Sequence, residues 1–433
     1  MNREIVMNTK NYESLKIFIW IYAFLIVFEG ALRKWFLPSL STPLLLIRDP
    51  IAIYIVIVAL IKRVPFGNNY IKIFLAINLW YIPLSVVFGH ESILTSIYGA
   101  RILMIHFPLM FIIGKVMEKE DIIKIGKTFL WLSIPMTMLL VLQFFSPSSA
   151  FINIGVGGIG TSGFSGALGY QRPSGTFSFT TGNTSFYIFC LIFCIYFWFT
   201  KQKINRFILL LSSLAILIAL PTSVSRSLVV GSGIVIIFGI MVAIKSQRNL
   251  KNLFQAIFGI LLLLLFLNLT GVSDKPVEVM TARFEKASDS TEDFVQNSIY
   301  DRFILSNIKT VTNLDKPIFQ FRLGEGTQGG ARLLNTAEEK TGIEGELIRL
   351  IYERGLLIGW LIILCRGLIA LDIVKRSWRA IATGEILPWL LCSKLILAMV
   401  LTMWGNNTLL GFAVLYVGFS LAILSNNDLK VKS

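Results

Sequence analysis

Residues able to do chemistry gather in one polar stretch, residues 273–346, of a chain that is otherwise strongly apolar. The stretch carries Arg302 and the glycine-spaced motif Leu323-Gly324-Glu325-Gly326. Where it ends, charged residues recur at helical spacing: Glu346, Arg349 and Glu353. Guanidinium groups bind phosphates through planar, bidentate hydrogen bonds, and carboxylates can accept protons. These residue types together predict a site that handles an anionic substrate.

The composition of the chain defines its broad class. Hydrophobic residues make up 55% and charged residues 15% of the chain, and the mean hydropathy is +0.72. Soluble domains have about a quarter charged residues, so these values indicate an integral membrane protein. Helical spans are expected because lipid offers no partner to unpaired backbone groups, and the alternating pattern of an outer-membrane barrel is absent. No cleavable signal peptide is expected, since the first apolar run lacks a cleavage site.

Twelve hydrophobic segments are long enough to cross a hydrocarbon core of about 30 Å as helices. They lie near residues 17–37, 44–61, 71–89, 95–114, 128–145, 183–200, 207–222, 228–244, 253–271, 347–372, 386–403 and 405–424. The expected fold class is therefore an all-α polytopic membrane protein with about twelve transmembrane helices. It forms a single integral membrane domain over residues 1–433.

The connections between these segments alternate in charge, which predicts their orientation. One set is short and basic, as at Lys62 and Arg63, and the positive-inside rule places it in the cytoplasm together with both termini. This set accounts for most of the formal net charge of +15. The outward set includes a glycine-rich loop at residues 146–182 and a large loop at 272–346, between spans nine and ten. A loop this long is expected to contain helices, and residues 298–312 have the apolar periodicity of a surface helix.

A group of arginines lies on the predicted outer side or at its membrane boundary, where the positive-inside rule does not require basic residues. The group comprises Arg172, Arg226, Arg302, Arg322, Arg332 and Arg349. A cluster of this kind suits an anionic lipid headgroup such as a diphosphate. The alternative is an ordinary solvated face, on which these arginines pair with nearby glutamates and lipid phosphates.

Arg101 lies inside the fourth expected span, about a turn and a half before His106. A charge at membrane depth costs roughly 2.5 to 3.5 kcal/mol and usually serves a purpose, although snorkelling toward the headgroups would also explain Arg101. No metal or cofactor is expected, because the four cysteines fall in expected spans, only two histidines are present, and nucleotide-binding motifs are absent. Nucleic acid is not expected as a partner, since the basic loops are short and flank the membrane.

Several short motifs follow one another in a recognisable order. They are Arg172-Pro173-Ser174-Gly175-Thr176-Phe177, Asn183, Ser225-Arg226-Ser227, Asp301-Arg302, Lys316-Pro317-Ile318, Leu323-Gly324-Glu325-Gly326 and the run from Glu346 to Gly359. In this order they resemble the O-antigen polymerase and O-antigen ligase superfamily, GT-C-like membrane glycosyltransferases of bacterial envelope glycan assembly. Near the N-terminus, Glu29-Gly30-Ala31-Leu32-Arg33-Lys34-Trp35 and Ile47-Arg48-Asp49-Pro50 are similar to a polymerase-like branch of the same superfamily.

The resemblance implies glycosyl transfer at the outer face of the bacterial cytoplasmic (inner) membrane. The donor would be a polyprenyl-diphosphate-linked oligosaccharide and the acceptor another lipid-linked repeat unit, with no metal or other cofactor. Arg226 and Arg302 would hold the diphosphate and stabilise the leaving group. The residues expected to bind substrate are Arg172, Arg349, Arg322, Glu353, Arg101 and Glu344. Membrane lipid, a chain-length regulator and a flippase are the further partners that the resemblance implies.

The chain departs from the superfamily at the position of the catalytic base. Many members have a His-Asn pair just before the last motif, whereas here Glu344-Gly345 occupies those positions and Glu346 follows. A carboxylate can take the proton from an attacking sugar hydroxyl, so Glu346 is the first candidate for the base and Glu344 the second. The alternative is that Glu346 is a first-turn residue favoured by the helix dipole.

Two other functions remain open. A ligase would pass the glycan to lipid or protein instead of to another repeat unit. A transporter or flippase would also have twelve spans with both ends inside, but it would be expected to show an internal repeat and broken midplane helices. No clear repeat is present, and the charge is concentrated in one outward segment, which favours an enzyme.

Overall fold

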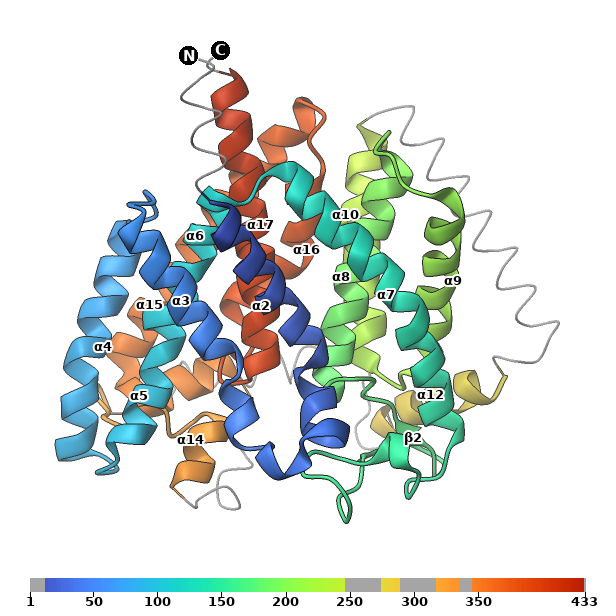
Figure 1. Ribbon diagram of the computed structural model, residues 1–433, viewed down its shortest axis with the longest axis horizontal. Coiled ribbons are helices and arrows are strands. Elements are labelled where there is room, and N and C mark those ends of the chain that lie inside the picture. The colour runs from blue at the N-terminus through green and yellow to red at the C-terminus, as the bar shows by residue number, and fades with distance from the viewer. Residues whose placement is uncertain (1–11, 246–273, 289–316, 335–344, 432–433) are drawn as a thin grey trace.

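The computed structural model describes residues 12–245, 274–288, 317–334 and 345–431, and the structural statements below concern these residues. Their regular structure is almost entirely helical (Figure 1). The only described strands are β1 (Phe164–Ser165) and β2 (Gln171–Arg172), which form one short antiparallel pair. The helical fold class predicted from the sequence is thereby confirmed.

Nine helical stretches among the described residues are long and apolar enough to cross a membrane. Single helices form five of them: α4 (Asn69–Phe88), α7 (Lys119–Phe145), α8 (Thr180–Phe199), α10 (Arg226–Ile244) and α15 (Glu346–Ala382). Composite stretches are α2 (Glu13–Ala31) with the π-helix η1 (Leu32–Phe36), η3 (Pro43–Leu46) with α3 (Arg48–Ile61), and α5 (Ile93–Arg101) with η4 (Ile102–His106) and α6 (Phe107–Val116). The ninth is the apolar part of α17 (Asn407–Val431).

Two apolar helices are shorter, namely α9 (Arg206–Thr222) and α16 (Leu387–Val400). The remaining helices are η2 (Pro38–Leu40), η5 (Phe151–Asn153), α12 (Asp274–Ser288) and α14 (Gln328–Leu333). A helix stands at eleven of the twelve segments expected to span the membrane. The expected span at 253–271 and the surface helix expected at 298–312 lie outside the described residues.

The helices form one bundle in which the outward segments predicted from the sequence share an end. Toward one end of the bundle α2 begins and α17 ends, whereas α12, α14 and the β1–β2 pair lie at the other end (Figure 1). We call the latter the α12–α14 end. The basic connection between α3 and α4 lies at the opposite end, as the alternation of charge predicts (Figure 1).

The centre of the bundle is formed by α8 and α17, whose apolar windows are each 83% buried, compared with 28% for α4. Helix α17 packs closely on α6 because glycines stand where they meet. A Cβ added at Gly418 would lie 2.6 Å from Ile113, and one added at Gly114 would lie 2.7 Å from Leu421. Small residues at helix contacts let backbones approach in this way in membrane proteins.

Candidate functional site

Gly355 divides α15 into two helices. Its backbone has φ 80° and ψ 175°, a conformation that glycine adopts far more readily than other residues. A Cβ built at Gly359 would lie 3.2 Å from the Cα of Ile351, whereas these positions would be about 12 Å apart along a straight helix. Residues 346–354 therefore fold back along the second helix, which differs from the uninterrupted span expected near 347–372.

A stretch of extended chain, residues 317–323, supports this turn. The N–H groups of Leu356 and Leu357 donate to the carbonyl oxygens of Pro317 and Ile318 at 3.1 and 3.2 Å. The first N–H groups of a helix have no partner within it, so the extended chain caps the second helix. The Lys316–Ile318 motif and the Glu346–Gly359 motif are thus joined by backbone hydrogen bonds.

Glu346, at the start of the folded-back segment, is completely buried and makes four hydrogen bonds. Its Oε1 accepts from Arg349 at 2.8 Å and from Arg366 at 2.6 Å. Its Oε2 accepts from Arg349 Nε at 2.9 Å and from the backbone N–H of Trp404 at 2.8 Å. The Arg366 guanidinium also lies over the Trp404 ring, 3.5 Å from the centroid. Both carboxylate oxygens are therefore fully engaged with the protein.

The same cluster continues through Glu353. Its Oε2 accepts from Arg349 at 2.8 Å and from Arg354 at 3.0 Å, and Arg354 in turn donates to Asn78 of α4 at 3.2 Å. We call Glu346, Arg349, Glu353, Arg354 and Arg366 the α15 ion cluster; each of its side chains is at most 2% exposed. Arginine suits such a site because its planar fork binds two acceptors at once.

The Leu323–Gly326 motif packs directly against this cluster. A Cβ at Gly326 would lie 2.8 Å from Arg349 and 3.1 Å from Glu353 Oε1, so only glycine allows this approach. Beside the motif, Arg322 donates to the hydroxyl of Tyr352 at 2.9 Å, and Tyr352 donates to Glu325 at 3.0 Å. The hydrogen bond to Tyr352 raises the pKa of Arg322, so Arg322 stays charged.

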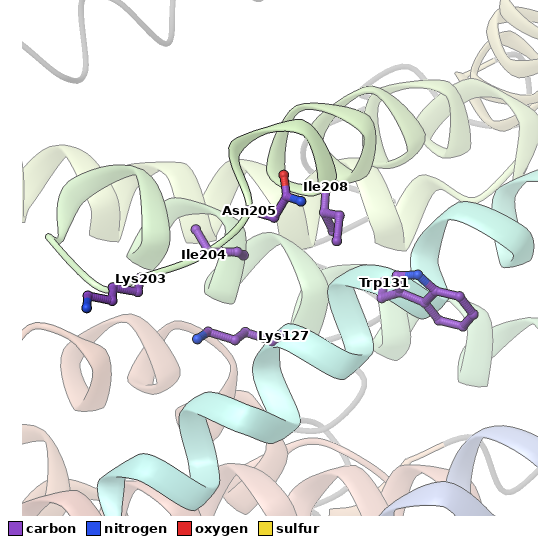
Figure 2. Close-up of a pocket in the computed structure, with 6 residues that line it drawn as sticks. All are labelled: Lys127, Trp131, Lys203, Ile204, Asn205 and Ile208. Atoms are coloured by element: carbon purple, nitrogen blue, oxygen red, sulfur yellow. The ribbon is translucent and has the colours of Figure 1, made fainter.

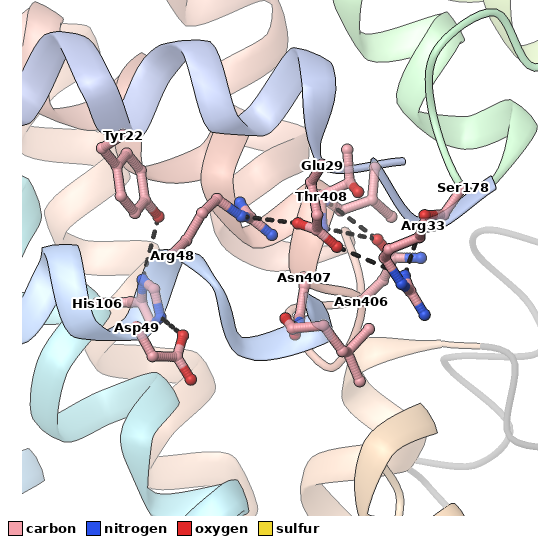
Figure 3. Close-up of polar contacts among 12 residues, drawn as sticks. Tyr22, Glu29, Arg33, Arg48, Asp49, His106, Ser178, Asn406, Asn407 and Thr408 are labelled. Atoms are coloured by element: carbon pink, nitrogen blue, oxygen red, sulfur yellow. Dashed lines mark hydrogen bonds and ion pairs between the residues drawn. The ribbon is translucent and has the colours of Figure 1, made fainter. Parts of the chain in front are cut away.

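A second buried group, which we call the Asp49 cluster, comprises Tyr22, Asp49, Arg101, His106 and Asn407. Figure 3 shows Tyr22, Asp49, His106 and Asn407. Arg101 donates to both oxygens of Asp49, at 2.7 and 2.9 Å, and to Asn407 at 2.5 Å. His106 Nε2 lies 3.0 Å from Oδ1 of Asp49, an oxygen that Arg101 also contacts, and His106 Nδ1 lies 3.0 Å from the Tyr22 hydroxyl. Arg101 is 5% exposed and paired, so it does not snorkel to the headgroups.

The N-terminal motif binds the chain at the end of the glycine-rich loop, where Arg33 donates to Ser178 (Figure 3). Glu29 accepts from Arg48 at 3.0 Å, and Arg33 bridges from Glu29 to the hydroxyl of Ser178. Lys34 donates to Ser174 at 3.1 Å and to the carbonyl of Gly175 at 2.6 Å. We call Glu29, Arg33, Lys34 and Arg48 the Glu29 cluster.

Backbone packing reinforces the contact of the Glu29 cluster with the loop. A Cβ at Gly30 would lie 2.2 Å from the backbone nitrogen of Ser178 and 2.4 Å from the carbonyl carbon of Phe177. No side chain fits there, so the glycine of the N-terminal motif lies directly on the Arg172–Phe177 motif of the loop.

The loop at residues 401–406 connects the clusters to one another. Trp404 binds Glu346, whereas Asn407, at the start of α17, binds Arg101 and donates to the carbonyl of Leu45 at 2.6 Å. Helix α16 has 14 residues and is about 21 Å long, shorter than a hydrocarbon core of about 30 Å. Helix α16 is thus too short to cross such a core by itself. The loop after it carries Trp404, which is completely buried.

The described buried side chains of these three clusters and of Glu325 carry more positive than negative charge. Seven are basic, namely Arg33, Lys34, Arg48, Arg101, Arg349, Arg354 and Arg366, and five are acidic, namely Glu29, Asp49, Glu325, Glu346 and Glu353. Ionisable groups at membrane depth are costly unless they are paired or serve a ligand. The excess favours an anion as the ligand of this region.

The structure brings together some of the residues predicted from the sequence. Glu346, Arg349 and Glu353 share one cluster, Arg322 lies beside it through Tyr352, and Arg101 belongs to the Asp49 cluster. Arg302 and Glu344 lie outside the described residues.

Arg172 and Arg226 belong to a different neighbourhood, around α12. Both are half-buried, Arg172 in β2 and Arg226 at the first position of α10. Tyr170 and Val224, two residues before each arginine, pack in one apolar group with Val279 of α12. Helix α12 thus brings the two arginine-bearing segments to one place.

Several charged residues of the site were not assigned a role from the sequence. Glu29, Arg33, Arg48 and Asp49 stood in motifs used only for the resemblance, and Arg354 and Arg366 were not singled out. Each of these residues interrupts or borders an apolar run of the sequence. This position is what could have identified it as a charged residue at membrane depth.

Fold and site together define a multi-pass helical membrane protein with ion-paired arginine clusters buried toward the α12–α14 end. Comparison with protein-family models, with curated proteins and with solved structures gives no match.

Proposed function

We propose that this protein is a polymerase of bacterial surface polysaccharide, such as O-antigen, capsule or exopolysaccharide. It transfers glycan from a polyprenyl diphosphate donor to another lipid-linked repeat unit at the outer face of the cytoplasmic membrane. The observation that carries the proposal is the convergence of the motifs. Segments distant in the chain meet at the α12–α14 end, in a region with an excess of buried arginine and lysine.

The charge of this region suits a diphosphate. Arginine remains protonated at every physiological pH and donates in the fork geometry that phosphate oxygens accept. Preorganised cations also stabilise the negative charge that develops on a diphosphate leaving group. The carboxylates of the clusters orient these arginines and offset most of their charge, and the excess of seven basic over five acidic groups remains positive.

An apolar cavity next to Arg226 supports a lipid-linked donor. It has a volume of about 320 Å³ and is lined by Pro221, Val229, Val277, Met280, Thr281 and Phe284, from α9, α10 and α12. Arg226 precedes Val229 by one helical turn, so it stands at the same face of α10. In the proposal the first isoprene units occupy this cavity, and the diphosphate is held by Arg226 together with Arg302.

The geometry changes the role that we give to Glu346. A general base must reach the hydroxyl that it deprotonates, yet both oxygens of Glu346 are bound inside the protein. We therefore assign Glu346 to the positioning of Arg349 and Arg366. Glu344, the second candidate, keeps the role of base in the proposal.

The proposed orientation places the α12–α14 end outside. The short basic connections then lie on the cytoplasmic side together with both termini, and the chain crosses the membrane about twelve times, as the positive-inside rule predicts.

The test is a reconstitution with lipid-linked repeat units, in which products are resolved by length. A ladder of longer glycans is expected from the wild type and is lost in Arg226→Ala and Arg302→Ala. Arg206→Ala is a matched control, because Arg206 is the first residue of α9 at the opposite end. Transfer of one glycan to lipid or protein without a ladder indicates a ligase. Transbilayer movement without longer products indicates a flippase, and either result contradicts the proposal.

A further inference from the structure

A second pocket lies away from the clusters described above, where the α8–α9 connection meets the first half of α7. Its volume is about 300 Å³, and Lys127, Trp131, Lys203, Ile204, Asn205 and Ile208 line it (Figure 2). Helix α7 begins and α8 ends at the end of the bundle opposite α12 and α14 (Figure 1). Nothing in the proposed glycan chemistry uses this pocket.

The pocket is polar at one side and apolar at the other. The side chains of Lys127 and Lys203 lie near each other, and Trp131 lies well apart from both (Figure 2). Trp131 follows Lys127 by four residues on the same face of α7, so it stands about 6 Å further from the helix start, toward the membrane interior. This order, cationic group first and apolar wall deeper, matches an amphiphile that enters from the membrane surface.

The charge of the pocket is purely positive. No carboxylate lines it, and in the part of the chain that the structure describes neither Lys127 nor Lys203 forms an ion pair. Its wall consists of Ile204, Ile208 and the indole of Trp131, which is 56% exposed. A free phosphate would leave this apolar wall unused, whereas a lipid would cover it.

We propose that this pocket binds an anionic phospholipid of the adjacent leaflet. The lipid phosphate lies between the ammonium groups of Lys127 and Lys203, and the glycerol and first acyl carbons lie on Trp131, Ile204 and Ile208. Basic pockets between helices on the cytoplasmic side of membrane proteins recognise lipid headgroups through the same combination of charge and apolar contact. The bound lipid would hold α7 against the α8–α9 connection.

Quenching of the fluorescence of Trp131 by a brominated lipid reports binding at the pocket. The purified full-length protein is placed in vesicles that contain brominated phosphatidylglycerol or brominated phosphatidylcholine, and tryptophan quenching is measured against lipid mole fraction. The chain has nine tryptophans, so the signal of Trp131 is the difference from Trp131→Phe. Phosphatidylglycerol is expected to quench this signal saturably at a lower mole fraction than phosphatidylcholine does.

Two double variants decide between the pocket and general surface charge. Lys127→Ala/Lys203→Ala is expected to raise the mole fraction for half-maximal quenching by about tenfold, because both cations of the site are lost. Lys124→Ala/Lys201→Ala removes the same charge from positions beside the pocket and is expected to leave it unchanged. Elution as a single species in size-exclusion chromatography shows that each variant is folded.

Three results would overturn the proposal. Equal quenching by both lipids would show that the charge is not recognised, and equal effects of the two double variants would show that the pocket is not the site. Displacement of the brominated lipid by millimolar inorganic phosphate would show recognition of phosphate alone, without the apolar wall.

Discussion

The guanidinium of Arg366 lies 2.6 Å from the carboxylate of Glu346, although twenty residues separate them in the chain. In an uninterrupted helix they would be about 30 Å apart. The turn at Gly355 brings them together and places Arg349 and Glu353 between α4 and the loop at residues 401–406. A charged segment is thereby held inside the bundle by ion pairs made largely within α15.

The first prediction concerns the ion cluster at Glu346. Glu346→Ala leaves Arg349 and Arg366 without their shared carboxylate, so we expect a loss of about 3–5 kcal/mol in the free energy of unfolding. Chemical denaturation in detergent measures it. Glu278→Ala is the control, since Glu278 pairs with Lys275 on an exposed face of α12, where solvent screens the interaction and little change is expected.

The isosteric Glu346→Gln variant separates positioning from base catalysis. We expect it to weaken stability and glycan transfer together, because its amide cannot serve both arginines as a carboxylate does. If Glu346→Gln has wild-type stability but produces no ladder of longer glycans, the result would indicate that Glu346 is the general base.

The second prediction concerns the turn in α15. Gly355→Ala places a Cβ 2.5 Å from the carbonyl oxygen of Ile318 at a positive φ, so it should destabilise the fold by at least about 1–3 kcal/mol. The measurement is the midpoint of thermal unfolding. Gly367→Ala, in the second helix of α15, is the control: its Cβ meets nothing within 4 Å, and alanine favours helix. Equal melting of the two variants would contradict the folded-back geometry.

The third prediction concerns the pair of Asp49 and Arg101. Single alanine substitutions each leave a buried charge, and a double-mutant cycle should give a coupling energy of about 0.5–3 kcal/mol. Unfolding free energies of the four proteins supply it. Additive effects would mean that the two residues do not interact in the folded protein. Asn407→Ala extends the cycle to the second partner of Arg101.

The fourth prediction concerns pH. The pKa of Arg322 is raised above its ordinary value by the hydrogen bond to Tyr352, so the contact is present below the unfolded pKa and is lost only as pH rises through the folded pKa. Tyr352→Phe removes this hydrogen bond and the one to Glu325, so it should reduce stability by about 1–3 kcal/mol, and by the same amount at about pH 6 and pH 9. Denaturation of both proteins at the two pH values tests it. If Tyr352→Phe is less stable than the wild type at only one of the two pH values, the loss of stability would have to come from a group other than Arg322.

Helix positions could be predicted from hydropathy, but the path within α15 could not. A single glycine in an apolar run is usually tolerated in a helix, and nothing local distinguishes Gly355, at the turn, from Gly367, inside the helix. The turn at Gly355 depends on the distant residues Pro317 and Ile318. Their carbonyl oxygens accept hydrogen bonds from the N–H groups of Leu356 and Leu357, which have no partner within the helix. Sequence spacing within one element does not reveal such a partner.

In the candidate site, too, contacts between residues close in the chain could be predicted, whereas contacts between distant segments could not. Glu346, Arg349 and Glu353 are three and four residues apart, so their shared face could be predicted from helical spacing. The pairing of Arg366 with Glu346, and that of Arg33 with Ser178, join segments that the chain separates by 20 and 145 residues. Composition indicates that such buried charges are energetically unfavourable, but it does not indicate which residues pair with them.

The contacts of α16 and of the loop after it also bear on how the protein is made. Glu346 and Arg366 complete their contacts with Trp404 and with the carbonyl of Met399, which follow them in the chain. A nascent chain that ends before α16 lacks these two contacts, although the ion pairs within α15 can already form. Residues 346–354 therefore complete their hydrogen bonds only after α16 and the loop at residues 401–406 have been synthesised, which makes this a late step in biogenesis.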